Sequence, residues 1–183
     1  MSSRPMEVPY MTCAEIIRVA RDVRQLFGLN VDHYPVVHVL EMGMLILDSE
    51  FTFSVKDHHE MKDDLGLTIP SENAIYLRSD VYNRASEDVP TDRFTVAHEL
   101  GHHFLHKNVP VVFHQANRPR TLKPEQDSEW QANIFGAALL MPVRRLNKCR
   151  SLEEAAVKFC VSKKTVAFFN RALVKAKLMK KLY

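Results

Sequence analysis

The sequence has few of the features that mark secreted or membrane proteins. Its 183 residues include only three cysteines, Cys13, Cys149 and Cys160, and none forms a C-x-x-C pair. An odd number without that spacing argues against a disulfide framework and favours reduced thiols. No apolar run approaches the ~18 residues of a membrane span. Residues 1–11 are charged and have no apolar core, so we expect no signal peptide and a cytoplasmic location.

The remaining composition is ordinary, but the charge is unevenly divided. Hydrophobic residues make up 46% of the chain and charged residues 26%, as in soluble globular proteins. Residues 144–183 contain 12 Lys or Arg against two acidic residues, whereas residues 1–143 carry a net charge of −7. We therefore expect a main domain over 1–143 and a basic helical extension over 144–183.

The most informative segment is 98–102, which reads H-E-x-x-H. It lies within 93–106, where apolar residues at helical spacing predict a helix. At about 3.6 residues per turn, positions i and i+4 share one face, so His98 and His102 can bind one metal ion. Glu99 can then reach a water molecule on that ion. Together these residues make most of a zinc hydrolase site.

A catalytic zinc ion usually takes a third protein ligand. His106 lies about 12 Å along the helix axis from His98, because each residue rises about 1.5 Å, so we expect it to support or cap the site. His103 points about 100° away from His102 around the helix. The metzincin continuation of the motif is absent as well. The third ligand is therefore expected from another element.

The best donor lies in a second helix, predicted to start at Asp127 and to stop at Pro142. Glu129 is the preferred ligand, because it shares a helix face with small residues such as Gly136. Small residues on that face allow close packing against the first helix. Glu125 and Asp127 are rival donors, but they lie at the start of the helix and lack that row of small residues.

Two histidines and one glutamate predict metal-assisted hydrolysis. Zinc lowers the pKa of its bound water from about 15.7 to about 7, and Glu99 takes the proton as general base and later passes it to the leaving amine. Manganese or iron would tolerate the same ligands. The oxyanion often needs a further donor, for which Tyr82, His103 and His114 are all candidates.

Two separated motifs resemble the ImmA/IrrE family of small bacterial and phage metallopeptidases; they read R-F-T-V-A-H-E-L-G-H-H-F-L-H at 93–106, and E-x-x-A-N-x-F at 129–135 with L-L-M-P at 139–142. The resemblance implies a compact gluzincin-like fold. It also implies that zinc is held by His98, His102 and Glu129, with Glu99 as base. Such proteins are typically encoded beside helix-turn-helix repressors and act on them, by cleavage or by relieving repression in another way.

Outside these motifs the pattern predicts one further helix and several strands. Residues 13–27 read as an amphipathic helix that Thr12 caps and Gly28 ends. Residues 36–40, 44–47 and 74–77 read as short strands. The last of these could form the lip of a substrate cleft, where an extended peptide adds by edge pairing, or could be a plain core strand.

The basic extension has its own helical pattern. Ser151 begins one capped helix, and residues 165–178 form an amphipathic segment after a turn. Two short helices about a tight turn resemble a helix-turn-helix, and the basic charge permits nucleic-acid binding. The alternative is a helical pair packed on the peptidase core with a solvated lysine face. A basic surface would also suit an acidic partner protein.

The sequence therefore predicts an α+β fold. A small, mainly antiparallel sheet is expected beside a helical bundle that carries the H-E-x-x-H helix, followed by a C-terminal helix-turn-helix-like element. The expected function is a zinc-dependent endopeptidase that acts on a cytoplasmic repressor-type helix-turn-helix protein and relieves repression. The alternative is a non-proteolytic, toxin–antitoxin-like module that sequesters such a partner or DNA. No membrane contact is expected.

Overall fold

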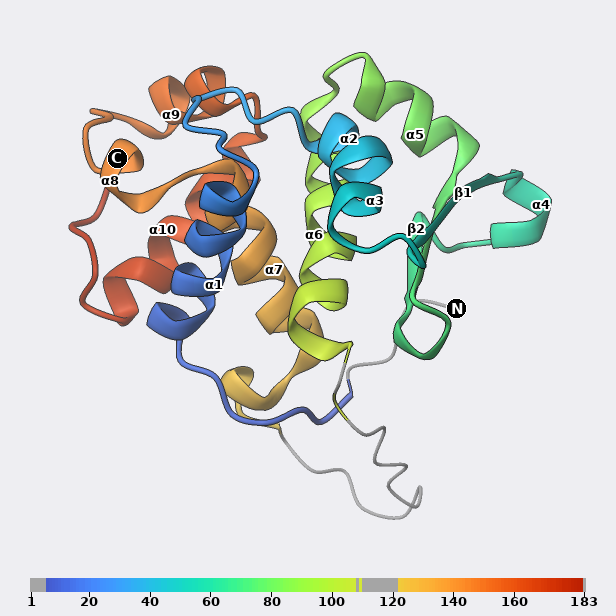
Figure 1. Cartoon of the computed structure of the whole chain (residues 1–183). Coiled ribbons are helices and arrows are strands. Elements are labelled where there is room, and N and C mark those ends of the chain that lie inside the picture. Colours follow the sequence, from blue (N-terminus) through green and yellow to red (C-terminus); the bar gives the residue numbers. More distant parts are fainter. Residues whose placement is uncertain (1–5, 108, 110–121, 183) are drawn as a thin grey trace.

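Helices dominate the fold and gather around two long helices that lie side by side, α6 and α7 (Figure 1). The structure is a computed structural model that describes residues 6–107, 109 and 122–182. The longer helices are α1 (Cys13–Leu26), α5 (Ser79–Ser86), α6 (Pro90–His106), α7 (Ser128–Leu140), α9 (Leu152–Phe159) and α10 (Lys163–Lys175). The short ones are α2 (Val36–His38), α3 (Met44–Leu47), α4 (His58–Met61) and α8 (Val143–Leu146).

A small mixed sheet flanks α6. It consists of β1 (Thr52–Lys56), β2 (Gly66–Ile69) and β3 (Ala74–Arg78) in the order β1-β3-β2. The predicted α+β class is confirmed, and β3 is the strand predicted at 74–77. The sheet is mixed rather than mainly antiparallel, because β3 pairs parallel with β1 and antiparallel with β2. Neither β1 nor β2 was predicted.

The prediction of strands at 36–40 and 44–47 is wrong. This segment is helical and runs through α2, a π-helical turn (Val39–Gly43) and α3. Its buried residues recur at helical spacing: Val36, Val39, Leu40, Gly43 and Met44. A short apolar run fits a buried strand or a buried helix equally well by periodicity, and here packing on α5 and α6 selects the helix.

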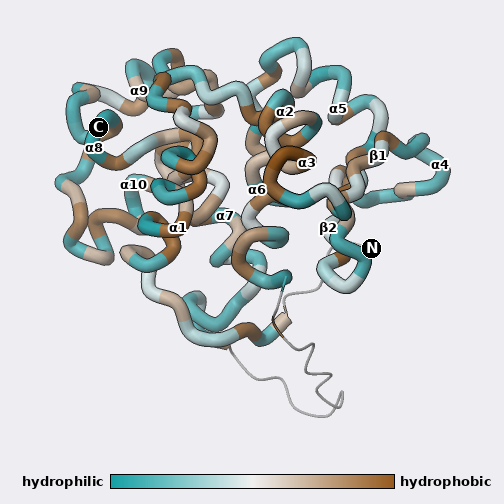
Figure 2. Tube along the Cα trace, viewed as in Figure 1, coloured by the Kyte–Doolittle hydropathy of each residue, from teal (hydrophilic) through white to brown (hydrophobic). Residues whose placement is uncertain are grey.

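Helix α1 follows its prediction closely. The Thr12 hydroxyl accepts a hydrogen bond from the Glu15 amide, and the Glu15 carboxylate accepts one from the Thr12 amide at 2.8 Å, which completes a capping box. Hydrophilic and hydrophobic residues alternate along the helix in Figure 2. Its apolar face, with Ile16 and Ala20 fully buried, packs against α7. Gly28 follows the helix with a φ of +64°.

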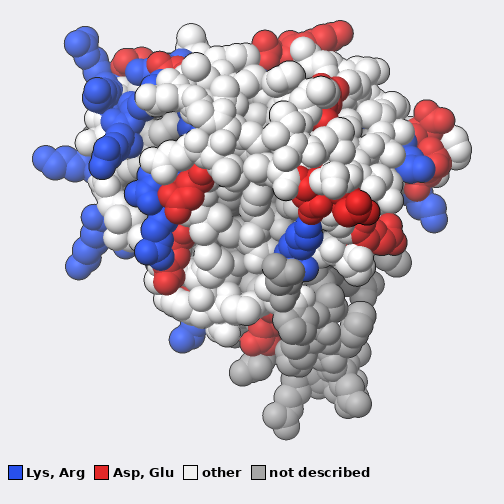
Figure 3. Space-filling model, viewed as in Figure 1, with Lys and Arg blue, Asp and Glu red and all other residues white. Residues whose placement is uncertain are grey.

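The C-terminal helices join the same core as the rest of the chain. Ser151 and Ser162 cap α9 and α10, whose Phe159 and Phe169 are fully buried in the cluster that also contains Leu139 of α7. The predicted pair of helices is therefore present. Its interpretation as a helix-turn-helix stays a prediction, as does the division of the chain after residue 143. On the face shown in Figure 3, Lys and Arg gather over these helices.

No helix in the described part of the chain is long and apolar enough to cross a membrane. The three cysteines are free, with Cys13 and Cys149 buried and Cys160 partly exposed.

Glycine permits a close crossing of α6 and α7. A Cβ at Gly101 would lie 3.0 Å from the Cα and carbonyl oxygen of Ala132, and one at Gly136 would lie 3.1 Å from the backbone of Ala97 and His98. The approaching atoms are backbone atoms, which cannot turn aside as a side chain can. The row of small residues on α7 therefore brings the two helices together, as the sequence pattern predicts.

We expect Gly101→Ala to destabilise the protein. Alanine is intrinsically the better helix former by about 1 kcal/mol, so the substitution would stabilise a helix that had room for it. Here the new methyl group collides with α7, and overpacking of this kind costs about 1–3 kcal/mol. Unfolding by denaturant measures the free energy of unfolding of the variant and of the wild type. A gain in stability would show that the crossing is looser than described.

Candidate metal centre

Three side chains converge where α6 crosses α7. His98 and His102 come from successive turns of α6, and Glu129 comes from the first turn of α7. The two Nε2 atoms lie 3.0 Å apart. Glu129 Oε2 is 3.4 Å from His98 Nε2, and Glu129 Oε1 is 3.3 Å from His102 Nε2. The structure thus brings together the three residues that the sequence proposes as ligands.

The spacing of these atoms fits a tetrahedral metal ion. Ligands at about 2.0–2.1 Å from zinc are separated from one another by about 3.3 Å, close to the separations found here. Glu129 Oε1 is also buried and forms no hydrogen bond with any described residue. A cation between the three side chains would satisfy that oxygen. The donor set, two imidazoles and one carboxylate, is therefore suited to a metal such as zinc.

The electrostatics of the cluster favour an ionised carboxylate. Burial alone would raise the pKa of Glu129, but its contacts with the imidazoles of His102 and His98 outweigh burial and hold the pKa far below its ordinary value. Burial likewise opposes the charged form of His98, yet Glu129 and Glu99 raise its pKa. The site thus presents negative charge and imidazole nitrogens to a cation.

Strand β2 of the sheet contacts the carboxylate of Glu99. It is 6% exposed, and its Oε2 accepts a hydrogen bond of 2.7 Å from the Thr68 hydroxyl of β2. Two residues earlier in β2, Gly66 lies against the same carboxylate, because a Cβ there would come within 2.6 Å of Glu99 Cγ. Neither residue was predicted from the sequence, because the strand that carries both was not predicted.

The strand edge beside α6 that an extended segment could pair with belongs to β2 rather than β3. The sequence left two interpretations open for residues 74–77, the lip of a substrate cleft or a plain core strand, and β3 is the central strand, which pairs on both sides. Strand β2 packs beside α6 and, in the described part of the sheet, has one unpaired edge. An extended segment can add only to such an edge.

His106 supports the site without joining the ligand cluster, as its distance along the helix predicts. Its Nδ1 lies 3.1 Å from His102 Nδ1, and its Nε2 lies 3.1 Å from Gln131 Oε1. Burial and the neighbouring imidazole of His102 lower the pKa of His106 to about 4, so the ring is neutral at pH 7. Gln131 was not singled out by the sequence.

The other sequence candidates that the structure describes lie outside the ligand cluster. His103 packs edge-on against Phe51, and burial lowers its pKa to about 4. The Tyr82 hydroxyl donates to Glu41 at 2.5 Å. Asp127 accepts a hydrogen bond from the Glu129 amide and so caps α7, while Glu125 is also absent from the cluster. His114 lies outside the described residues, and the oxyanion donor stays unassigned.

Two further groups of possible ligands are accounted for by other contacts. His33, Asp88 and Cys160 lie close together, but Asp88 already pairs with the buried guanidinium of Arg93 at 2.7 Å. That fixed cation disfavours a second one. The remaining group, around Asp57 and Glu60, is exposed and forms the capping box of α4.

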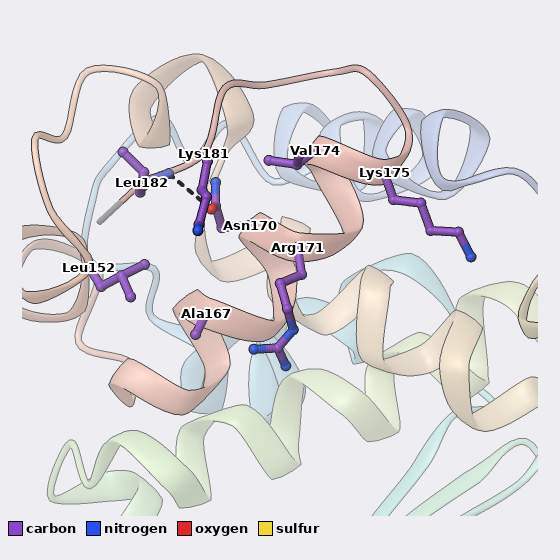
Figure 4. Close-up of a pocket in the computed structure, with 8 residues that line it drawn as sticks. All are labelled: Leu152, Ala167, Asn170, Arg171, Val174, Lys175, Lys181 and Leu182. Atoms are coloured by element: carbon purple, nitrogen blue, oxygen red, sulfur yellow. Dashed lines mark hydrogen bonds between the residues drawn. The ribbon is translucent and has the colours of Figure 1, made fainter.

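A separate hollow lies between α10 and the C-terminal segment (Figure 4). Its volume is about 370 Å³, and its lining is mainly apolar, with Arg171 and Lys175 among the residues around it. The buried side chain of Asn170 ties the C-terminal segment to α10, because Asn170 Oδ1 accepts from the Leu182 amide at 3.0 Å. The hollow contains none of the proposed metal ligands.

Comparison with known proteins gives two matches. The model of the peptidase M78 family, described as the IrrE N-terminal-like domain, matches residues 52–169. The metallopeptidase ImmA of Bacillus subtilis (strain 168) is 36% identical over 63 residues, which are 34% of this chain and 36% of that protein. The match to this curated relative therefore spans only about a third of its length.

We expect the wild-type protein to bind about one metal ion per chain, and each of His98→Ala, His102→Ala and Glu129→Ala to lose it. Loss of a ligand should weaken binding by more than the roughly 10–100-fold caused by loss of an outer hydrogen-bond partner. Elemental analysis of purified proteins measures the content.

Glu125→Ala is the matched control, because it removes a nearby carboxylate that the structure keeps out of the cluster. Its metal content should equal that of the wild type. Full occupancy in Glu129→Ala, or loss in Glu125→Ala, would mean that the third ligand has been assigned to the wrong residue.

Proposed function

Because the chain belongs to the ImmA/IrrE family of metallopeptidases, we propose that it is a zinc-dependent endopeptidase that cleaves a repressor-type helix-turn-helix protein in the cytoplasm and relieves repression. The observation that carries this proposal is the convergence of His98, His102 and Glu129, with Glu99 close enough to His98 to raise its pKa. Three ligands leave a fourth position for water or substrate, as in catalytic zinc sites.

The chemistry follows from the placement of Glu99. Zinc held by the three ligands would supply a water molecule of lowered pKa and polarise the scissile carbonyl. Glu99 accepts the proton of the attacking water and passes it to the leaving amine. The Thr68 hydroxyl donates a hydrogen bond to Glu99 Oε2. The other carboxylate oxygen, Oε1, is therefore the one that takes up and releases the proton. The missing side chain at Gly66 keeps Oε1 uncovered, because a Cβ there would lie only 2.8 Å away.

The edge of β2 that no described strand pairs with is the proposed binding place for the substrate backbone. An extended peptide that adds to β2 would run beside α6, with its carbonyl groups near Glu99. Main-chain pairing tolerates many side chains. Selection of one regulator would therefore need contacts elsewhere, for which the basic C-terminal helices offer a surface to an acidic partner.

A second candidate function is a binding module that sequesters a helix-turn-helix partner or DNA without cleaving anything. The 12 basic residues at 144–183 favour it. Figure 3 shows Lys and Arg gathered on the side of the molecule where α8 to α10 lie. Phosphate contacts by Lys and Arg would make DNA binding fall steeply with salt. A retained biological effect without proteolysis would distinguish this function from the first.

We expect Glu99→Gln to keep its metal and lose cleavage. The amide cannot accept the proton of the attacking water, and loss of a general base costs about 10²–10⁴-fold in rate. Purified protein is incubated with repressor-type helix-turn-helix proteins from the same organism, and mass spectrometry detects fragments. Cleavage at the wild-type rate by Glu99→Gln would remove Glu99 from the mechanism. Derepression in cells by this inactive variant would favour the binding module.

Thr68→Val tests how the base is held. Valine keeps the shape but cannot donate to Glu99, so we expect kcat to fall about tenfold, the loss of about one hydrogen bond to a charged group, while metal content is unchanged. Thr68→Ser keeps the hydroxyl and should recover most of the rate. Equal kcat values for the valine and serine variants would show that the hydrogen bond does not position Glu99.

A further inference from the structure

The two histidines of the proposed metal site differ in what holds their second ring nitrogen. His98 Nδ1 lies 3.1 Å from Asn133 Oδ1, an oxygen that only accepts, so this nitrogen carries the hydrogen. His102 Nδ1 instead faces another ring nitrogen, Nδ1 of His106, at 3.1 Å. One of these two nitrogens must donate and the other must accept, and the choice decides which nitrogen of His102 is free for a metal.

Gln131, which contacts the other ring nitrogen of His106, determines which of the two nitrogens donates. Its Nε2 donates to the carbonyl oxygens of Pro9 at 2.8 Å and Glu125 at 2.9 Å. These two bonds use both amide hydrogens and orient the carboxamide, so Oε1 faces His106 Nε2 at 3.1 Å. Because an amide oxygen only accepts, His106 must carry its hydrogen on Nε2.

The tautomer of His106 in turn determines the tautomer of His102. A neutral His106 with its hydrogen on Nε2 has a bare Nδ1, which can only accept. His102 must therefore donate from Nδ1, which leaves Nε2, the nitrogen that points at Glu129, as the one that can bind a metal. The opposite arrangement would turn His106 into an imidazolium at 4% exposure, and burial of such a charge is costly.

The carbonyls that orient Gln131 are themselves fixed. The segment before α1 lies against the segment before α7, with the Val8 amide bonded to Gln126 O at 3.0 Å and the Met11 amide to Glu125 O at 2.9 Å. Gln131 is 1% exposed and lies between these two segments. Its orientation is thus set by backbone that is held independently of the metal site.

We propose that Gln131 and His106 are positioning residues that form a hydrogen-bond relay, which holds His102 in the tautomer that binds metal through Nε2. This rests on the proposed metal site but not on proteolysis. Ligating histidines usually donate their second nitrogen to a carboxylate, a carbonyl or water. Here a second histidine takes that place, and Gln131 is the residue that makes it an acceptor.

Zinc affinity of a matched pair of variants tests the relay. Asparagine at 106 places Oδ1 where histidine has Nδ1, so His106→Asn keeps an acceptor for His102, whereas His106→Leu has none. We expect zinc affinity, measured by competition with a chromophoric chelator, to stay near wild type in His106→Asn and to fall about 10–100-fold in His106→Leu. Circular dichroism checks that each variant is folded.

A second variant changes Gln131, which contacts His106 and not the proposed ligand His102. Gln131→Met keeps the length of the side chain but removes its hydrogen bonds, so His106 can adopt either tautomer, and zinc affinity should fall about tenfold. Gln126→Met is the control, because it makes the same replacement nearby without touching His106. Equal zinc affinities in the two methionine variants would overturn the relay.

Long-range ¹H–¹⁵N NMR of the metal-free wild type reads the tautomers directly. We expect a hydrogen on His102 Nδ1, and His106 protonated only on Nε2. A bare His102 Nδ1, or a hydrogen on His106 Nδ1, would overturn the relay, as would zinc affinity in His106→Leu equal to that of wild type. A wild type that binds no zinc would instead overturn the metal site and the relay together.

Discussion

The backbone contact between α6 and α7 is the constraint on which the site depends. Packed helices usually lie 8–10 Å apart, with the distance set by the side chains between them. Here glycine on each helix faces backbone of the other, so no side chain separates them at the crossing. That approach places the first turn of α7 within reach of His98 and His102. A wider crossing would carry Glu129 away from the two histidines and break up the proposed ligand set.

The proposed metal ligands and the proposed catalytic carboxylate are supported by different parts of the fold. The ligands depend on the helix crossing, whereas Glu99 is held by Thr68 and Gly66 of β2. Loosening the sheet would therefore affect proton transfer more than metal binding, and loosening the helix pair would do the reverse. The same strand that holds Glu99 has an edge that no described strand pairs with, so a substrate that added there, as proposed, would couple its pairing to the orientation of Glu99 through β2.

The sequence predicted the parts of the site that depend on helix periodicity. The i, i+4 spacing brings His98 and His102 together whatever surrounds them, and small residues on one face of α7 indicate close packing. The sequence did not predict β1 and β2, because pairing with β3 is decided by contacts between distant segments. Thr68 and Gln131 were missed for the same reason. Their roles arise only when β2 lies on α6, and when the segment before α1 reaches α7.

The burial of so many polar groups argues for a function at this crossing. Glu99, His102, His106 and Gln131 are all buried. A helix pair that served stability alone would gain from apolar residues here, because buried polar networks are costly unless every member is satisfied. This network is satisfied up to Gln131 at one end, and at the other it stops at Glu129 Oε1, which has no hydrogen-bond partner among the described residues. The unsatisfied oxygen lies beside the two imidazoles that the relay and Asn133 orient, so a metal ion bound there would complete the network.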